Sequence, residues 1–193
     1  SEMCIRDSHL PGREHKMTAA GKPLPGVEIR ILDENGNDLP PGEIGEVAIR
    51  SPNNTRGYWN KPEESAKALI GDGWLRTGDA GILDEEGYLH IQDRIKDMII
   101  TGAENVYPAE VESAIYGHPA VADVAVIGVP DPKWGEAVKA MVVLKPGAEA
   151  DEAAIIGHAR ERIAGFKCPK SVDFIEALPR NPSGKILRRT LRE

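Results

Sequence analysis

Hydrophobic and polar residues alternate along several short segments of the first half of the chain. Such alternation predicts β-strands, because successive side chains of a strand point to opposite faces of a sheet. The expected strands are residues 27–32, 44–50, 74–77, 81–83 and 88–92. Asp33-Glu34-Asn35-Gly36 predicts a turn. Pro62, followed by two acids, predicts a short helix over 62–70, since proline and negative charge suit a helix N-terminus.

The pattern changes after Asp93, where strands begin to alternate with helices. Strands are expected at residues 98–101, 121–129, 137–144 and 172–175. Two apolar stripes with helical spacing predict helices over 108–116 and 151–164. A strand-rich first half followed by a mixed second half predicts an α+β fold, with a domain boundary near residues 93–96.

The composition is that of a folded protein. Of 193 residues, 40% are hydrophobic and 28% are charged, which argues against disorder. The length corresponds to about 1.3 domains of ~150 residues. It therefore permits one large domain or two compact units.

The net charge of −7 gives no reason to expect a nucleic-acid partner. The charge is unevenly distributed, because the chain from His158 onward holds nine basic and four acidic residues, a local charge of +5. A basic segment on an acidic body predicts a local anion site, for example for a phosphate. The alternative is a solvated C-terminal helix.

Cys4 and Cys168 are the only cysteines, too few for a disulfide framework or a metal cluster. The longest apolar stretch, residues 121–129, is far shorter than the roughly 18 residues of a membrane span. The N-terminus shows no secretory pattern. A cytoplasmic protein without a membrane span or a metal centre is expected.

Two polar clusters could carry chemistry near the predicted boundary. Asp79, in Thr77-Gly78-Asp79 at the end of a predicted strand, could accept hydrogen bonds from both hydroxyls of a ribose; the alternative is a simple turn. Arg94 and Lys96 lie in Asp93-Arg94-Ile95-Lys96-Asp97. The arginine could grip a phosphate or ribose and the lysine would suit a hinge; the alternative is a solvated linker.

A third cluster, Asn181-Pro182-Ser183-Gly184-Lys185, precedes Arg188 and Arg189. Gly184 permits close approach of the backbone to a ligand, and the Lys185 ammonium supplies a compact charge for an oxyanion or phosphoryl group. The spacing of a P-loop is absent. Taken by itself, the segment could be a surface turn.

Together these clusters belong to six motifs whose order and spacing resemble the late motifs of acyl-CoA synthetases in the adenylate-forming (AMP-binding) superfamily. They are GEIGE (42–46), RGYWNKP (56–62), GWLRTGD (73–79), DRIKDMII (93–100), ENVYPAEVE (104–112) and PSGK (182–185). The resemblance covers residues 21–193. Residues 1–20 are expected to be a loop or a foreign extension, because residues 1–8 carry no such resemblance.

The resemblance implies a domain organisation. Residues 21–93 would be the C-terminal, β-rich and distorted barrel-like portion of a truncated large AMP-binding domain, residues 94–96 a hinge, and residues 97–193 a small mobile domain. The first portion is expected to leave apolar surface uncovered where the rest of the large domain would pack.

The resemblance also implies a two-step reaction. A carboxylate, expected to belong to a fatty or related acid, attacks ATP to form an acyl-AMP, and the thiol of coenzyme A then displaces AMP. Asp79 would bind the ribose, Arg94 the ribose and phosphate, and Lys185 the α-phosphate and acyl carboxylate. Lys96 occupies the position of the family's hinge, about which the small domain turns between the two steps.

In the second orientation, the segment around Gly102 and Ala103 would line the pantetheine tunnel, where the family commonly has two glycines. Trp134 and Phe166 resemble positions that contact coenzyme A, with core packing as the alternative. Relatives often carry arginine where Cys168 stands, so the contact to the phosphate of coenzyme A could pass to Lys167 or Lys170.

The family's earlier motifs, including the phosphate loop and the glutamate that binds Mg²⁺, do not occur in this sequence. The chain is therefore expected to be the C-terminal part of a longer ligase, inactive by itself and partnered by the missing N-terminal domain. Two alternatives stay open. One is an adenylation domain that acts on a carrier protein, and the other is a non-catalytic remnant that binds a nucleotide or coenzyme A.

Overall fold

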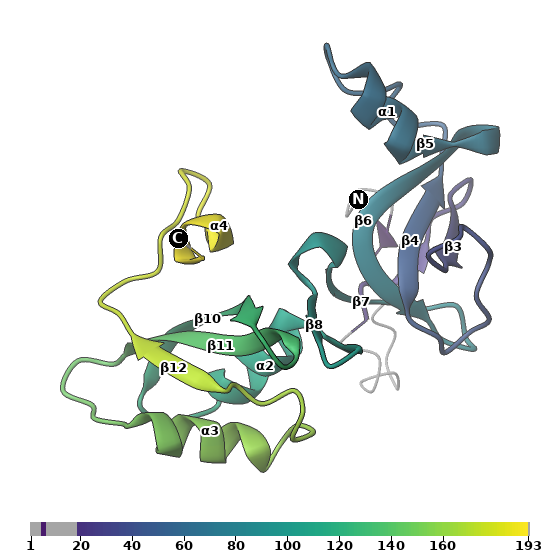
Figure 1. Ribbon diagram of the computed structural model, residues 1–193. Coiled ribbons are helices and arrows are strands. Elements are labelled where there is room, and N and C mark those ends of the chain that lie inside the picture. Colours follow the sequence, from purple (N-terminus) through teal and green to yellow (C-terminus); the bar gives the residue numbers. More distant parts are fainter. Residues whose placement is uncertain (1–4, 7–18, 193) are drawn as a thin grey trace. The chain divides into compact units, whose positions relative to one another are not determined.

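The computed structural model describes residues 5–6 and 19–192 and divides the chain into two compact units, Ser1–Lys96 and Asp97–Glu193. The first unit contains a five-stranded sheet and the two-stranded β1–β2 sheet, the second unit contains another five-stranded sheet, and each unit has a few short helices (Figure 1). The predicted α+β fold class is confirmed.

The first unit is built on a five-stranded antiparallel sheet in the order β3-β4-β6-β5, with β7 also paired to β6. The strands are β3 (Glu28–Leu32), β4 (Gly45–Arg50), β5 (Leu69–Ile70), β6 (Trp74–Leu83) and β7 (Leu89–Arg94). The long strand β6 curves strongly, so the sheet curls into a half-barrel (Figure 1). β1 (Ile5–Arg6) lies within residues 1–20, the segment expected to be a loop, and pairs with β2 (Lys22–Pro23), which follows that segment. Most of residues 1–20 lie outside the described residues.

Alternation along these strands produces two small apolar clusters, one on each face of the curled sheet. The first contains Ile31, Val47, Ile49 and Leu89, and the second Leu32, Ala48 and Trp74. The guanidinium groups of Arg30 and Arg50 lie 4.3 and 5.0 Å from the Trp74 ring centroid. These cation–π contacts cover an aromatic side chain that apolar residues alone do not enclose.

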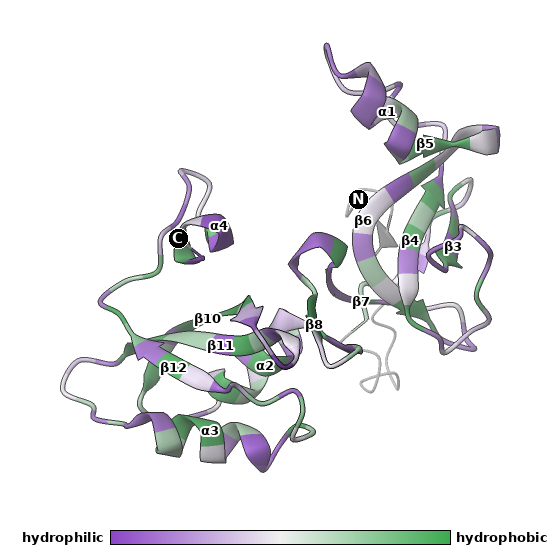
Figure 2. Cartoon of the chain, viewed as in Figure 1, coloured by the Kyte–Doolittle hydropathy of each residue, from purple (hydrophilic) through white to green (hydrophobic). Residues whose placement is uncertain are grey.

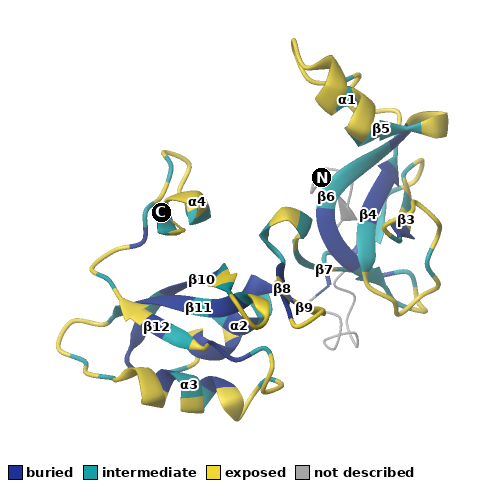
Figure 3. Ribbon diagram, viewed as in Figure 1, coloured by how far each residue is buried: buried dark blue, intermediate teal, exposed yellow. Residues whose placement is uncertain are grey.

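The helix predicted at Pro62 is α1 (Pro62–Ala68), which ends two residues earlier than expected because Leu69 and Ile70 pair with β6 as β5. α1 is hydrophilic (Figure 2) and buries none of its residues (Figure 3). Trp59, just before it, is 90% exposed, and Ile44, Tyr58 and Ile91 are 43–51% exposed. These side chains agree with the expectation of uncovered apolar surface in the β-rich part.

The second unit is built on a sheet in the order β10-β11-β8-β9. β12 also pairs with β11, in parallel, along the edge of β11 that faces away from β10. The strands are β8 (Ile99–Thr101), β9 (Glu104–Val106), β10 (Val121–Asp131), β11 (Gly135–Leu144) and β12 (Ser171–Phe174). β9 is not among the strands predicted from the sequence. β10 and β11 are long, apolar (Figure 2) and largely buried (Figure 3).

The two faces of this sheet are covered differently. One face packs against α2 (Pro108–Tyr116) and α3 (Glu152–Arg160), which contribute Val111, Ile115, Ile155 and Ala159 to the core. The other face packs against the C-terminal segment, through Leu178, Ile186 and Leu191. The segment that carries Lys185 is therefore packed against this second face of the sheet and is not a free tail.

The helix predicted over 108–116 is confirmed, whereas α3 is shorter than the predicted 151–164. Asp151 caps α3 by accepting a 2.7 Å hydrogen bond from the Ala154 backbone N–H. At the other end, the Arg162 Nη1 donates to the His158 backbone carbonyl. A side chain thus satisfies a terminal carbonyl that a longer helix would have satisfied. No helix in the described residues is long and apolar enough to span a bilayer.

His158 in α3 lies against His118, with ring centroids 5.1 Å apart. Burial lowers the pKa of His158, the charges of Arg162 and His118 lower it further, and Glu161 acts in the opposite direction. Its folded-state pKa is then below the ordinary value of about 6.5 that applies in the unfolded chain. In the window between these two values the unfolded state binds more protons, so stability rises with pH.

We expect the melting temperature of the chain to fall as the pH drops from 7 through this window. His158→Gln should weaken that fall, because glutamine does not titrate. Thermal unfolding of both proteins between pH 5 and pH 8 measures the difference. The same pH dependence in both proteins would contradict the assignment.

Candidate functional site

Thr77-Gly78-Asp79 is not at the end of a strand, as the sequence predicts, but inside the continuous strand β6. Glu46 pairs with Ala80 and Ala48 with Arg76, so three residues of β6 stand opposite the single residue Val47 of β4. Gly78 has φ of +73°, which glycine adopts without strain. The cluster is a bulge, and a bulge re-aims side chains and ends local pairing.

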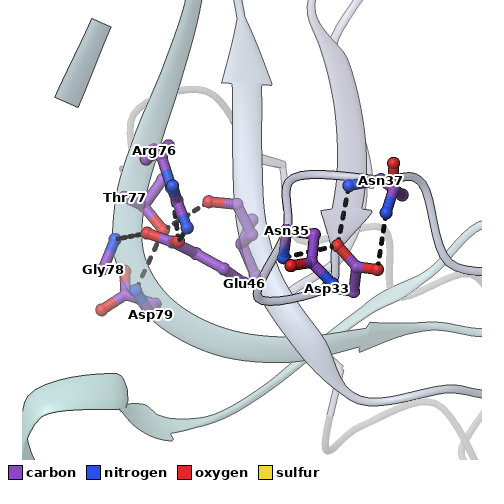
Figure 4. A network of polar contacts seen from close by, with 9 residues as sticks. Asp33, Asn35, Asn37, Glu46, Arg76, Thr77, Gly78 and Asp79 are labelled. Atoms are coloured by element: carbon purple, nitrogen blue, oxygen red, sulfur yellow. Dashed lines mark hydrogen bonds and ion pairs between the residues drawn. The ribbon is translucent and has the colours of Figure 1, made fainter. Parts of the chain in front are cut away.

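Side chains hold this bulge in place (Figure 4). Glu46 Oε2 accepts a 2.6 Å hydrogen bond from Arg76 Nε, and its Oε1 accepts one of 3.1 Å from the Gly78 backbone N–H. Thr77 Oγ1 donates to the Val47 carbonyl and accepts from the Asp79 backbone N–H. The Glu46 carboxylate thus replaces the ladder partner that the bulge removes. The sequence predictions did not single out Glu46 or Arg76 individually.

The same view shows the turn after β3, where Asp33 accepts from the backbone and side chain of Asn37 and from the Asn35 backbone (Figure 4). The hydrogen bond from the Asn37 side chain is the main reason why the pKa of the exposed Asp33 carboxyl is lowered. These bonds close the predicted turn. They have no part in the candidate site.

Asp79 and Arg94 face one another across β6 and β7 as paired residues. Arg94 Nε lies 2.8 Å from Asp79 Oδ1, and the side chains are 51% and 11% exposed, respectively. The nearly buried carboxylate is oriented by the guanidinium, which keeps half of its surface open. A fixed carboxylate beside an open guanidinium can accept hydrogen bonds from ribose hydroxyls and donate to a phosphate. The structure brings together two residues that the sequence predicted separately.

Lys96 lies in a single 3₁₀ turn, Ile95–Asp97, and its side chain is exposed. The turn follows β7 directly and contains the point where the chain passes from the first unit to the second. This is the place at which a change of backbone dihedral angles would reorient one unit against the other.

Gly102 and Ala103 form the two-residue loop of the β8–β9 hairpin, because Thr101 pairs with Glu104. Their φ angles are +60° and +67°. Two central residues with positive φ are the signature of a type I′ turn, which suits glycine or asparagine at both positions. Ala103 is therefore held in the left-handed region. Compared with a glycine at this position, alanine adds a methyl group and also introduces backbone strain.

Ala103→Gly is expected to stabilise the chain. A left-handed residue other than glycine costs about 1–2 kcal/mol, and glycine removes this cost. Glycine also raises the conformational entropy of the unfolded chain, which offsets about 0.4–1 kcal/mol of the gain. The net gain in unfolding free energy should be about 0.5–1 kcal/mol, measurable by urea denaturation. Gly102→Ala is the opposite control, since its Cβ would lie 2.7 Å from a Trp134 ring atom. Unchanged stability of Ala103→Gly would refute the strain.

Trp134 packs on the Gly102 backbone, which donates a 2.9 Å hydrogen bond to the Trp134 carbonyl. The ring is still 42% exposed, and the Lys133 ammonium lies 4.5 Å from the ring centroid. Asp131 Oδ1 accepts from the backbone N–H groups of both residues and orders the loop. The alternative of simple core packing does not describe Trp134, because the ring keeps an accessible surface.

Phe166 is also 42% exposed. The neighbouring Lys167 is engaged, since its Nζ lies 2.7 Å from both carboxylate oxygens of Glu110. Cys168 is only 1% exposed and belongs to the core. Of the two lysines proposed to contact a phosphate, Lys170 is exposed, and its backbone N–H is fixed to the Val138 carbonyl at the start of β11.

Lys185 is exposed and directly follows the turn of a short hairpin closed by pairing of Arg180 with Ile186. Its backbone carbonyl accepts a 2.9 Å hydrogen bond from the Asn181 backbone N–H. Asn181 Oδ1 accepts hydrogen bonds from the backbone N–H groups of Ser183 and Lys185, at 3.0 and 2.9 Å. Gly184 has φ of +84° and makes the sharp turn possible. This ordered loop presents an ammonium group to solvent.

Arg188, at the start of α4 (Arg188–Leu191), ties the C-terminal segment to the rest of its unit. Its Nη2 lies 2.7 Å from Glu112 Oε1, and its Nη1 lies 3.8 Å from Asp97. The same Glu112 oxygen accepts from the Val126 backbone N–H at 2.8 Å. The sequence predictions did not include these contacts. In the part of the chain that the structure describes, no group of three or more potential metal ligands comes together.

Two family models match the chain. The model of the AMP-binding enzyme family matches residues 1–59, a range that includes the segment expected to be a loop or foreign extension. The model of the AMP-binding enzyme C-terminal domain matches residues 110–185, with Lys185 as the last matched residue.

Similar proteins are ligases. The chain is 48% identical over 186 residues to a fatty acid–[acyl-carrier-protein] ligase of Streptomyces coeruleorubidus, covering 96% of this chain and 36% of the relative. It is 49% identical over 181 residues to a long-chain-fatty-acid–CoA ligase of Bacillus subtilis, covering 93% and 32%. The structure of o-succinylbenzoate CoA synthetase from Bacillus subtilis with its acyl-adenylate intermediate matches with a TM-score of 0.87 at 41% identity, covering 93% and 36%. The chain thus spans about a third of the length of these relatives.

Proposed function

The chain belongs to the AMP-binding enzyme family, as a C-terminal part, and from this premise we propose that it is part of an ATP-dependent acyl-CoA ligase. The complete enzyme would form an acyl-AMP from a carboxylic acid and ATP and then transfer the acyl group to coenzyme A. Residues 21–93 would complete a large nucleotide-binding domain. Residues 97–193 would be the mobile domain that follows the hinge.

The observation that carries the proposal is the ion pair between Asp79 and Arg94. The Asp79 carboxylate can accept hydrogen bonds from the ribose hydroxyls, while the open side of the Arg94 guanidinium can face a phosphate. The Glu46 contacts fix the bulge from which Asp79 projects. The pair is therefore preorganised for a nucleotide before any ligand binds.

In the first step, a carboxylate oxygen would attack the α-phosphorus of ATP and pyrophosphate would leave. Negative charge grows on the α-phosphate oxygens as the new bond forms. We assign its stabilisation to the Lys185 ammonium, which the Asn181 loop presents. Mg²⁺ is expected to accompany ATP. Its ligand is assigned, as the family resemblance implies, to the part of the enzyme that precedes this chain.

In the second step, the thiol sulfur of coenzyme A would attack the acyl carbonyl carbon and AMP would leave with the bonding electrons. We assign Trp134 and the Gly102–Ala103 turn to the pantetheine arm, because they form one contiguous surface. Phe166 would contact the nucleotide end of coenzyme A, with Lys170 as the lysine near its phosphate. The small domain would turn about Lys96 between the two steps.

The expected acyl substrate is a fatty acid, in line with the fatty-acid ligases reported above as relatives. The acyl pocket would belong to the preceding domain, so the isolated chain is expected to be inactive. A carrier protein as acceptor is the second candidate, since one relative is a ligase for an acyl carrier protein. The exposed ring of Trp134 suits a pantetheine arm in either case.

The deciding experiment uses the complete protein that contains this chain. Pyrophosphate exchange into ATP is measured with fatty acids of several lengths, and thioester formation is then measured with coenzyme A and with a pantetheinylated carrier protein. We expect exchange with a fatty acid and thioester formation with coenzyme A. Transfer to the carrier protein alone would favour the second candidate.

Calorimetry of the 193-residue chain with AMP and with coenzyme A tests the remaining alternative. Absence of exchange in the complete protein, together with saturable binding of AMP or coenzyme A to the chain, would favour a non-catalytic remnant. Exchange without such binding would show that the preceding domain supplies most of the affinity.

A further inference from the structure

We propose that Arg180 is a positioning residue that fixes the Lys185 loop to strand β10 through Asp123. The catalytic part of this inference rests on the role proposed for Lys185 in adenylation. The clamp itself is a structural statement about the chain and can be tested without any activity.

The clamp consists of two short hydrogen bonds from one guanidinium. Arg180 Nη1 donates to the Gly184 backbone carbonyl at 2.7 Å, and Nη2 donates to Asp123 Oδ2 at 2.6 Å. The Gly184 carbonyl is part of the peptide bond that joins Gly184 to Lys185. Arg180 therefore holds the backbone immediately before the lysine.

Asp123 is suited to serve as the anchor. A register irregularity between Val121 and Asp123 interrupts pairing of β10 with β11, and such irregularities redirect side chains. Asp123 Oδ1 accepts a 3.0 Å hydrogen bond from the Val124 backbone N–H, which leaves Oδ2 for Arg180. Both oxygens of the carboxylate are thus engaged, and its orientation is set by the long strand pair β10–β11.

The other contacts of the loop do not fix its direction relative to the sheet. The hydrogen bonds to Asn181 Oδ1 come from Ser183 and Lys185, so they organise the loop only internally. Ile186 packs in the cluster with Ala125 and Ile127 and secures the base of the hairpin. The Arg180 clamp is a hydrogen-bonded contact that ties the Gly184 carbonyl, directly before Lys185, to Asp123 of β10.

An arginine suits this task better than a lysine. The planar guanidinium offers several donors in a fixed arrangement, so one side chain can bond a carboxylate and a carbonyl at the same time. The alternative role for Arg180 is direct binding of a substrate phosphate. The two roles differ in what they predict for Asp123, because a carboxylate would repel a phosphate but is needed for the clamp.

The first test is backbone hydrogen exchange in the 193-residue chain. Arg180→Met keeps an apolar stem and removes both hydrogen bonds. We expect the amide protons of Gly184 and Lys185 to exchange roughly tenfold faster, which corresponds to about 1.4 kcal/mol of lost local protection. Arg50→Met is the matched control, since Arg50 forms a similarly exposed ion pair with Glu28 in the other unit. Unchanged exchange in Arg180→Met would overturn the clamp.

The second test measures both half-reactions in the complete protein. We expect Arg180→Met and Asp123→Asn each to slow adenylation on the order of 10- to 100-fold, since displacement of a catalytic group by about 1 Å can cost that much. The KM for ATP and thioester formation from supplied acyl-AMP should be little changed. A loss in Arg180→Met but not in Asp123→Asn would overturn positioning in favour of direct phosphate binding.

A double-mutant cycle separates action through Lys185 from general damage. In a Lys185→Ala background, Arg180→Met should cause no further loss of adenylation, because the residue it positions is gone. An additional loss equal to that in the wild-type background would reject the inference. If the wild-type protein forms no acyl-adenylate, the proposed function fails, while hydrogen exchange still decides whether the clamp exists.

Discussion

Replacing Lys185 by alanine in the complete protein is expected to reduce acyl-adenylate formation to a small residual rate and to leave thioester formation from supplied acyl-AMP largely intact. The physical reason is that charge develops on the α-phosphate only in the first step. Removal of one preorganised group that stabilises such charge costs on the order of 10²- to 10³-fold in rate. The Lys185 side chain is exposed on an ordered loop, so its removal should leave the fold unchanged.

The measurement is pyrophosphate exchange for the first half-reaction and release of AMP from acyl-AMP and coenzyme A for the second. Lys67→Ala, at an exposed position of α1, is the control for loss of a surface charge. An equal loss of both half-reactions in Lys185→Ala would contradict the role assigned to this lysine. A normal rate of adenylation would contradict it as well.

The sequence predicts the members of the candidate site, which stay predictions, but it does not predict their contacts. The order of the motifs identified Asp79, Arg94 and Lys185 individually. The ion pair between Asp79 and Arg94 depends on the register of β6 against β7, which no local pattern encodes. The contacts that hold the Lys185 segment are still more distant in sequence. Arg180 and Asp123 are 57 residues apart, and Arg188 and Glu112 are 76 apart.

The errors in the strand predictions have a local physical cause. Residues 74–83 were predicted as two strands with a turn between them because alternation fails at Thr77-Gly78-Asp79. In the structure the strand continues, and the two extra residues of the bulge interrupt the alternation only locally. The Glu46 side chain supplies the partner that makes such a bulge stable. A failed period next to a glycine can therefore indicate a bulge as well as a turn.

In the short hairpin β8–β9, the sequence predicted a strand at β8 but missed β9. β9 has only three residues, too few to show a period. The loop of the hairpin, Gly102–Ala103, contains one glycine where a type I′ turn usually has glycine or asparagine at one or both positions. The strain at Ala103 becomes visible only from the observed φ angle.

Lys96→Pro in the complete protein is expected to impair thioester formation more than adenylation. Proline fixes φ at residue 96 and disfavours helical dihedral angles at Ile95, so it restricts the turn that joins the two units. If the small domain must reorient between the steps, the second half-reaction depends on dihedral changes that proline does not permit. We expect at least a tenfold lower rate of the second step, about 1.4 kcal/mol in barrier height.

Lys96→Ala separates the backbone effect from loss of the side chain. Alanine removes the ammonium group but leaves the dihedral angles free, so both half-reactions should proceed at nearly the wild-type rate. The melting temperatures of both variants should be compared with wild type, because a strained proline could also loosen the turn. Unchanged thioester formation in a folded Lys96→Pro protein would reject Lys96 as the hinge. A loss in Lys96→Ala equal to that in Lys96→Pro would instead assign the effect to the lysine side chain, since only the proline restricts the backbone.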